Sequence, residues 1–229
     1  IENGASSYFR VNVDGTILEG GIASDFEIAA KDSLRVFLFV NTAETNEDEP
    51  VAVEDKLVFV LESGVHQEVV LSAYSQDVIQ LKSKRIDVDT TLDGKKPFQI
   101  YDSLVVEKGA TLTINSGVRL YFHPASNLIV HGTLKVHGTL DAPVVMRGDR
   151  LGNMFSDQPY DRIPGQWGGV IFTKDSYDNY LNYCDIHSGS FGILCDSSDV
   201  SRRKLDIENS IIHNVNGHGL YSKMSQIFL

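Results

Sequence analysis

The sequence lacks any long apolar run and any surplus of basic residues. Its longest apolar stretch, residues 36–40, has the length of a β-strand, whereas a membrane-spanning helix needs roughly 18 apolar residues. The sequence therefore predicts no membrane-spanning helix. The net charge of −11 argues against a nucleic-acid partner, because neutralising phosphates requires clustered Lys and Arg. The same charge disfavours the binding of polyanionic glycans.

Cysteine is also scarce. Cys184 and Cys195 are the only two, which excludes a disulfide framework and the paired CxxC spacing of a zinc site. Both fall on positions that would face inward in a strand, so we expect buried free thiols, and a bridge between them is the alternative. The chain opens on Ile1 without a charged and apolar leader, so we expect that any targeting segment lies upstream or has been removed.

Residues 1–92 contain apolar stretches that alternate with polar residues, bounded by Gly, Asp, Asn and Ser. Such stretches predict β-strands. The acidic residues 41–50 predict a solvated loop, and residues 62–65 predict a tight hairpin turn with Gly64 at positive φ. We expect a β-sandwich that lacks its opening strands. The expected strand stretches are SSYFRVNV, DFEIAA, SLRVFLFVNT, DKLVFVLES and VHQEVVLSAYS.

From Tyr101 onward the spacing of apolar residues changes. The stretch TTLDGKKPFQ, residues 90–99, predicts a domain boundary. After it come apolar pieces of three to five residues, separated by Gly-bearing turns. Strands this short, with a corner after each, are typical of a solenoid in which every strand pairs with those above and below it. We therefore expect an all-β chain with a sandwich over residues 1–92 and a parallel β-helix over residues 93–229.

The stretch IVHGTLKVHGTL, residues 129–140, repeats VHGTL after six residues. Period two puts its apolar residues on one face and leaves Gly132 and Gly138 at corners. His131 and His137 would lie up to roughly 20 Å apart along a strand, too far to share a zinc ion, so we interpret the repeat as scaffold. The residues expected to face inward are Leu128, Val130, Leu134, Val136 and Leu140.

A longer repeat relates residues 183–197 to residues 209–223. It places His187 and His213 at equivalent positions of successive coils, where we expect the two rings to stack without a functional role. The lone Trp167 is expected in the core rather than on a sugar. Residues 149–165 predict a long excursion from the coil.

These stretches resemble the right-handed parallel β-helix family of the pectate-lyase-like superfamily. The matching stretches are VVEKGATLTINSGVRLYFHPASNLIVHGTLKVHGTLDAPVVMRGDR, YDRIPGQWGGVIF and NYCDIHSGSFGI. They are similar to uncharacterised surface lipoproteins of Gram-negative gut anaerobes. Residues 30–77 resemble the immunoglobulin-like module of the abnormal-spindle and hydin type. The resemblance implies a lipidated N-terminus upstream, further coils after Leu229, and a location on the outer membrane or in the periplasm.

The best-known enzymes of this superfamily act on acidic polysaccharides. A lyase needs Ca²⁺ held by clustered carboxylates together with an Arg or Lys base. We interpret the candidate groups as structural because the acids are irregularly spaced and lie mostly at turns, where Asp binds backbone amides. We expect no catalytic, cofactor or metal residue, with Ca²⁺ required only if the chain is a lyase. The candidates are Asp175, Asp178, Asp185, Asp196 and Asp199, with Arg202, Arg203 and Lys204.

The sequence thus favours a non-enzymatic surface protein that binds a glycan or another surface protein along the flank of the β-helix. Tyr160, Tyr177 and Tyr180 are the expected glycan contacts, because they lie in or beside loops. The alternative is a polysaccharide lyase or glycoside hydrolase. An enzyme should show converging carboxylates, whereas a binding protein should show a flat aromatic or polar strip.

Overall fold

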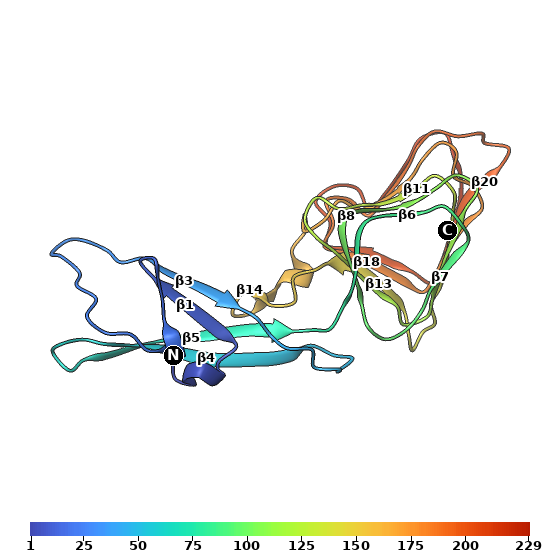
Figure 1. Ribbon diagram of the computed structural model, residues 1–229. Coiled ribbons are helices and arrows are strands. Elements are labelled where there is room, and N and C mark those ends of the chain that lie inside the picture. Colours follow the sequence, from blue (N-terminus) through green and yellow to red (C-terminus); the bar gives the residue numbers. More distant parts are fainter. The chain divides into compact units, whose positions relative to one another are not determined.

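The computed structural model describes residues 1–229, which form two compact units, Ile1–Asp77 and Val78–Leu229 (Figure 1). The division lies before the expected boundary at residue 92. The reason is that β6 (Ile79–Ile86) pairs in parallel with β8 (Phe98–Val106), and β7 (Thr90–Leu92) pairs in parallel with β9 (Thr111–Asn115). Residues 78–92 therefore form the first coil of the solenoid, and the stretch TTLDGKKPFQ lies within the β-helix, where residues 93–97 form the turn between β7 and β8.

The second unit is a parallel β-helix with three faces, and Figure 1 views it nearly along its axis. The first face contains the N-terminal halves of β6 and β8, then β10 (Arg119–Phe122), β13 (Val144–Gly148), β18 (Cys184–His187) and β21 (Ile211–His213). The second face contains the C-terminal halves of β6 and β8, then β11 (Leu128–Val130), β16 (Val170–Phe172), β19 (Ile193–Cys195) and β22 (Leu220–Ser222).

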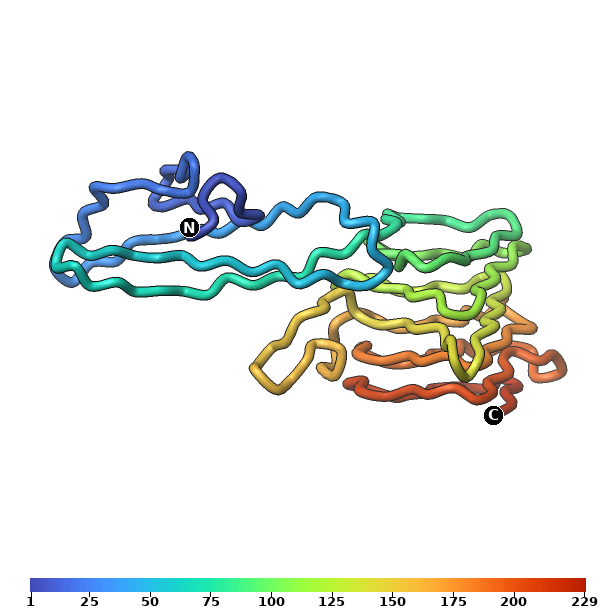
Figure 2. The backbone as a smooth tube through the Cα atoms, turned by 90° about the horizontal axis from the view of Figure 1, so that it is seen from below, coloured from blue at the N-terminus to red at the C-terminus, as the bar shows by residue number.

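The third face is a six-stranded sheet with one strand from each coil, so the helix has six coils (Figure 2). Its remaining strands are β12 (Thr133–His137), β17 (Asn179–Asn182), β20 (Arg203–Glu208) and β23 (Gln226–Phe228). All pairings within it are parallel. The predicted solenoid is therefore confirmed.

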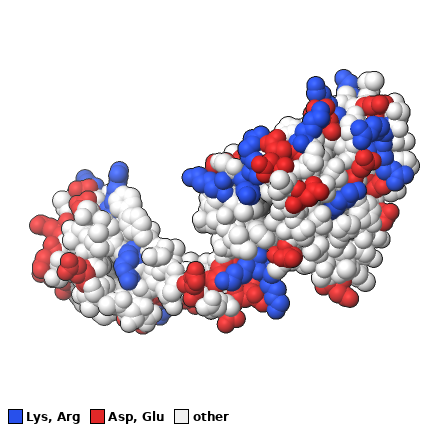
Figure 3. All heavy atoms as spheres, turned by 45° about the vertical axis from the view of Figure 1, so that its right-hand side comes forward, with Lys and Arg blue, Asp and Glu red and all other residues white.

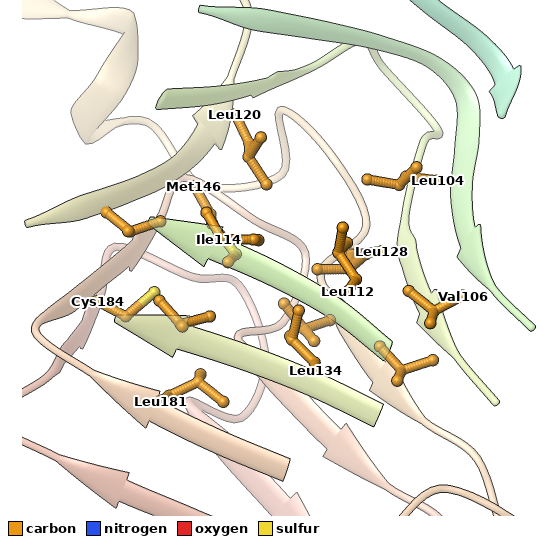
Figure 4. Close-up of a cluster of buried hydrophobic side chains, with 14 of the residues drawn as sticks. Leu104, Val106, Leu112, Ile114, Leu120, Leu128, Leu134, Met146, Leu181 and Cys184 are labelled. Atoms are coloured by element: carbon orange, nitrogen blue, oxygen red, sulfur yellow. The ribbon is translucent and has the colours of Figure 1, made fainter. Parts of the chain in front are cut away.

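The core of the β-helix runs continuously through the coils, because alternate residues of every strand point inward (Figure 4). Leu128, Val130, Leu134 and Val136 are fully buried, as the VHGTL repeat predicted. Leu140 was expected beside them but is 77% exposed, because β12 ends at His137 and the chain has already turned.

The repeated glycines occupy corners of the coil. A Cβ at Gly132 would collide with the carbonyl oxygens of Ala110 and Glu107, and one at Gly138 would collide with the carbonyl oxygen of Tyr183. These oxygens belong to the neighbouring coils, so only glycine lets the backbones approach this closely. The prediction that both glycines take corners is confirmed.

Residues 149–165 leave the coil, as expected, and form β14 (Asn153–Phe155), β15 (Gln158–Pro159) and the 3₁₀ turn η3 (Tyr160–Arg162). The chain contains no α-helix, and no helical segment is long and apolar enough to cross a membrane. Cys184 and Cys195 are both buried free thiols, as predicted.

The first unit contains small antiparallel sheets. β1 (Phe9–Val13) lies between β2 (Thr16–Ile17) and β3 (Val36–Val40). β4 (Val51–Val60) and β5 (His66–Ser75) form a hairpin whose turn has Gly64 at φ +80°, as expected.

Two further short segments of this unit are 3₁₀ turns, η1 (Gly4–Ser6) and η2 (Glu19–Gly21). The expected strand DFEIAA is absent, since residues 25–30 pair with no other strand. The acidic residues 41–50 form a loop, as predicted. The immunoglobulin-like arrangement expected here remains a prediction.

Candidate functional site

The outer surface of the third face carries two rows of polar and aromatic side chains, which we call the third-face rows. Because side chains alternate along a strand, every second residue of β9, β12, β17 and β20 points outward, and parallel pairing aligns these residues from coil to coil. The first row is Thr113, Lys135, Tyr180 and Asp206, and the second is Asn115, His137, Asn182 and Glu208.

Tyr180 and His137 form the aromatic centre of the third-face rows. Their ring centroids lie 5.7 Å apart at 45°. The Tyr180 hydroxyl donates a hydrogen bond of 2.9 Å to Glu208 Oε2, and this bond, with a smaller contribution from burial, raises the pKa of Tyr180. The amide of Asn182 accepts a hydrogen bond from Asn209. The arrangement offers two rings flanked by amide, carboxylate and ammonium groups.

Charge is mixed over this part of the molecule. Lys and Arg alternate with Asp and Glu on the side of the β-helix that Figure 3 displays, without a field of one sign. Arg203 pairs with Asp206 at 2.7 Å and lies over the Phe228 ring at 4.5 Å. The third-face rows are therefore suited to a ligand of little net charge.

The three expected glycan-contact tyrosines do not form one surface. Tyr177 precedes β17, and the Arg202 guanidinium covers one face of its ring at 4.0 Å. Tyr160 lies on η3, which packs beside β13 of the first face, and Arg150 covers its ring at 4.8 Å. The structure brings Tyr177 and Tyr180 to the same end of the third face and leaves Tyr160 on another face.

Most of the candidate carboxylates bind separate partners. Asp175 pairs with Lys108 at 3.6 Å, and Asp178 pairs with Arg202 at 3.3 Å. Asp199 accepts a hydrogen bond from the backbone amide of Ser201, which lowers its pKa. These contacts match the structural interpretation of these acids as turn and surface groups.

Lys204, a further candidate group, belongs to β20, and its fully buried side chain reaches the corner before β17. Its ammonium group donates to the carbonyl oxygens of Thr173 and Ser176, and burial lowers its pKa. The carbonyl of the same residue accepts a hydrogen bond from the buried Asn179 side chain. Lys204 therefore satisfies polar groups between coils.

Asp185 lies on the first face, where it contacts two histidines. We call Asp185, His187 and His213 the histidine cluster. His187 Nδ1 lies 2.8 Å from Asp185 Oδ1, and His213 Nε2 lies 3.1 Å from the same oxygen. The two rings stack with centroids 4.7 Å apart, as expected from the longer repeat.

Sequence reasoning had treated Asp185 apart from the histidines. The signal that could have joined them is the D-x-H spacing, which places residues 185 and 187 on one side of a strand. Burial raises the pKa of the Asp185 carboxyl, but hydrogen bonds and charge from His187 and His213 outweigh it, so that pKa lies below its ordinary value.

Buried aromatic side chains support the backbone of the histidine cluster. Trp167 is buried, as predicted, and stacks on Phe122 with centroids 4.2 Å apart. Its indole N–H donates a hydrogen bond of 2.8 Å to the backbone carbonyl of His187. Arg147 lies close to Asp185 and pairs with Asp161 of the excursion at 3.4 Å. The strand that carries Asp185 and His187 is thereby held in place.

Comparison with known proteins confirms the family expected from the sequence. Residues 84–203 match the model of the pectate-lyase-like β-helix domain family. The chain is also similar to Protein bark beetle of Drosophila melanogaster, with 38% identity over 72 residues. That stretch covers 31% of this chain and 2% of the fly protein. No solved structure matches the chain.

Proposed function

The chain belongs to the pectate-lyase-like β-helix domain family, and on that premise we propose that its β-helix binds a neutral glycan along the third-face rows without cleaving it. The observation that carries the proposal is the Tyr180 and His137 pair, set in rows of amide and charged side chains on a flat parallel sheet. Aromatic rings present an apolar face with a polar edge, and the flanking Asn115 and Asn182 provide donors and acceptors for hydroxyl groups.

The positions of the carboxylates favour binding over catalysis. A glycoside hydrolase needs two carboxyl groups on either side of the scissile bond, one with a raised pKa. The carboxyl groups of Asp55, Asp185 and Asp199 have displaced pKa values, and each of the three is displaced downward. Asp175 and Asp178 are each paired with a different cation, so they are poorly placed to hold one Ca²⁺ ion together.

The proposed setting of the module is the cell surface. In this proposal a lipid anchor upstream of the chain holds it at the outer membrane, and the β-helix presents its third face to glycans outside. A rigid stack of paired strands suits such an extended binding surface. A surface protein is the other class of ligand that the sequence favoured, and binding to an immobilised protein without any glycan would replace the glycan proposal.

The test is a binding titration of the purified chain against a panel of neutral and acidic polysaccharides. Tyr180→Ala should weaken retention of a neutral glycan roughly tenfold, which corresponds to about 1.4 kcal/mol. Tyr221→Ala is the matched control, because this exposed tyrosine lies on the second face. Equal binding by both variants would exclude the third face as the site.

The same panel tests the enzymatic alternative. Incubation with and without Ca²⁺, followed by assays for unsaturated uronates and for reducing ends, should show no product. A Ca²⁺-dependent unsaturated product would identify a lyase instead, and new reducing ends would identify a hydrolase.

A further inference from the structure

The histidine cluster has the donor set of a transition-metal site. Its three ligand atoms, one from each side chain, all lie within 4.8 Å of one another. Ligands at about 2.0–2.1 Å from a tetrahedral Zn²⁺ ion lie roughly 3.3 Å apart, so small side-chain rotations would accommodate the ion. Two imidazoles and one carboxylate suit Zn²⁺ and neighbouring transition metals and are poor ligands for Ca²⁺.

The backbone fixes these ligands. Asp185 and His187 project from the same side of β18 because they are two residues apart, and the pairing of β18 with β21 aligns His187 with His213. His187 is 6% exposed, and Trp167 binds its carbonyl oxygen. The ligands therefore come from paired strands of a packed helix, which limits the cost of ordering them on binding.

Asn214 determines which of the two ring nitrogens of His213 carries the hydrogen. Asn214 Nδ2 donates a hydrogen bond of 2.9 Å to the carbonyl oxygen of Arg162. Because a carbonyl oxygen only accepts, the amide cannot be reversed, and Asn214 Oδ1 is the atom that contacts His213 Nδ1. The hydrogen on the neutral ring is then on Nδ1, and Nε2 has none.

A bare Nε2 and a carboxylate oxygen 3.1 Å apart repel each other unless a cation lies between them. A divalent metal ion in that position would bind both atoms. Metal-binding histidines characteristically donate their other ring N–H to an oxygen acceptor, which is the contact that Asn214 provides.

From this geometry we infer that Asp185, His187 and His213 bind one divalent transition-metal ion, with Zn²⁺ preferred. The metal is coordinated by Asp185 Oδ1, His187 Nδ1 and His213 Nε2, and the single hydrogen of the neutral His187 ring moves by exchange with solvent from Nδ1 to Nε2. The side chains of Asp185 and His213 are 30% and 39% exposed, so a fourth position remains open to water. The site lies on the first face and is independent of the proposed glycan site.

The experiment is a titration of the purified full chain with Zn²⁺ in competition with a chromophoric chelator, and with Co²⁺ followed by its visible absorption. We expect one ion per chain, unaffected by excess Ca²⁺. Asn214→Ala should weaken Zn²⁺ binding roughly 10–100-fold, as is typical for loss of a group that orients a ligand, and His213→Gln should weaken it more.

His131→Gln is the matched control, because this histidine of the second face binds Thr173 and lies outside the cluster. Circular dichroism and unfolding midpoints establish that each variant is folded. Weak Zn²⁺ binding that is equal in wild type, His213→Gln and Asn214→Ala would overturn the inference, as would a loss of binding with His131→Gln.

Discussion

The two units of this chain use the same kinds of residue in opposite ways. In the β-helix, buried residues from the first five coils form one continuous cluster, and partly buried residues of the last coil pack against it. In the first unit the buried cluster contains only Phe9, Val11, Val13, Val53, Leu57 and Leu71. Both units are built from strands rich in apolar residues, so the kinds of residue are not what separates them.

The difference lies in how the strands are stacked. In a solenoid each strand has a neighbour above and below and encloses a shared interior, so every added coil buries its inward residues. β3 of the first unit pairs only with β1, and four of its five residues, from Phe37 to Val40, are exposed. An apolar strand adds buried side chains to a core only where neighbouring strands enclose it.

The largest expected effect comes from a corner glycine of the β-helix. Gly132→Ala should destabilise this unit by more than about 4 kcal/mol, the range of exceptional single substitutions, because the new Cβ collides with the backbone of the preceding coil. Urea denaturation measures this change in the free energy of unfolding. Gly152→Ala is the control, because open space surrounds that position. A small effect of Gly132→Ala would mean that the coils are not closely stacked there.

The second-largest expected effect is a difference in stability between substitutions of two leucines, Leu134 and Leu140. Leu134→Ala should cost about 2–5 kcal/mol because it leaves a cavity in the enclosed core. Leu140→Ala, at a residue that is mostly exposed, should stay within about 0.5 kcal/mol. Comparable losses of stability in the two variants would show that Leu140 packs into the core after all.

The third effect depends on pH and involves the buried thiols. Burial raises the pKa of Cys184 far above its ordinary value of 9.0, and that of Cys195 to about 11. Each thiol therefore contributes stability that is fully present below pH 9. The contribution is lost as pH rises further, because the unfolded chain ionises first.

Cys184→Ala isolates the effect of one thiol. Between pH 9 and the folded pKa, wild type should lose up to about 1.4 kcal/mol per pH unit more than the variant. Urea midpoints from pH 8 to 10.5 provide the comparison. The lowered pKa of Lys204 makes stability rise with pH instead. Because Lys204 is present in both proteins, its contribution cancels in the comparison. Parallel pH profiles would contradict the assigned burial.

The smallest effect is expected in the first unit. Phe39→Ser should change the stability of that unit by within about 0.5 kcal/mol, because the side chain is 60% exposed. It should reduce self-association in sedimentation velocity, since exposed apolar edge strands promote pairing between chains. Phe9→Ser, at a buried position of the same sheet, should unfold the unit. A strong destabilisation by Phe39→Ser would show that β3 contributes to a core.

Sequence reasoning succeeded where the signal repeats over short distances. The spacing of apolar pieces predicted the solenoid, and the VHGTL repeat predicted four buried residues and both corner glycines. It failed at Leu140, where the apolar pattern continues past the end of β12, and at DFEIAA, where a strand-like pattern has no strand to pair with. It also placed the domain boundary at residue 92, because no signal in the sequence near β6 and β7 shows that these strands pair with later ones.

The sequence by itself determined the β-helix, its inward faces and its buried thiols, because each follows from strand alternation and a corner repeated along the chain. The stacking of His187 on His213 also followed from the longer repeat, whereas only the tertiary structure decided the other contacts between outward residues. Tyr180 contacts His137 of the preceding coil, and Asp185 contacts His213 of the following coil. Such contacts depend on the register between coils, which backbone pairing sets and which the local order of residues leaves undefined.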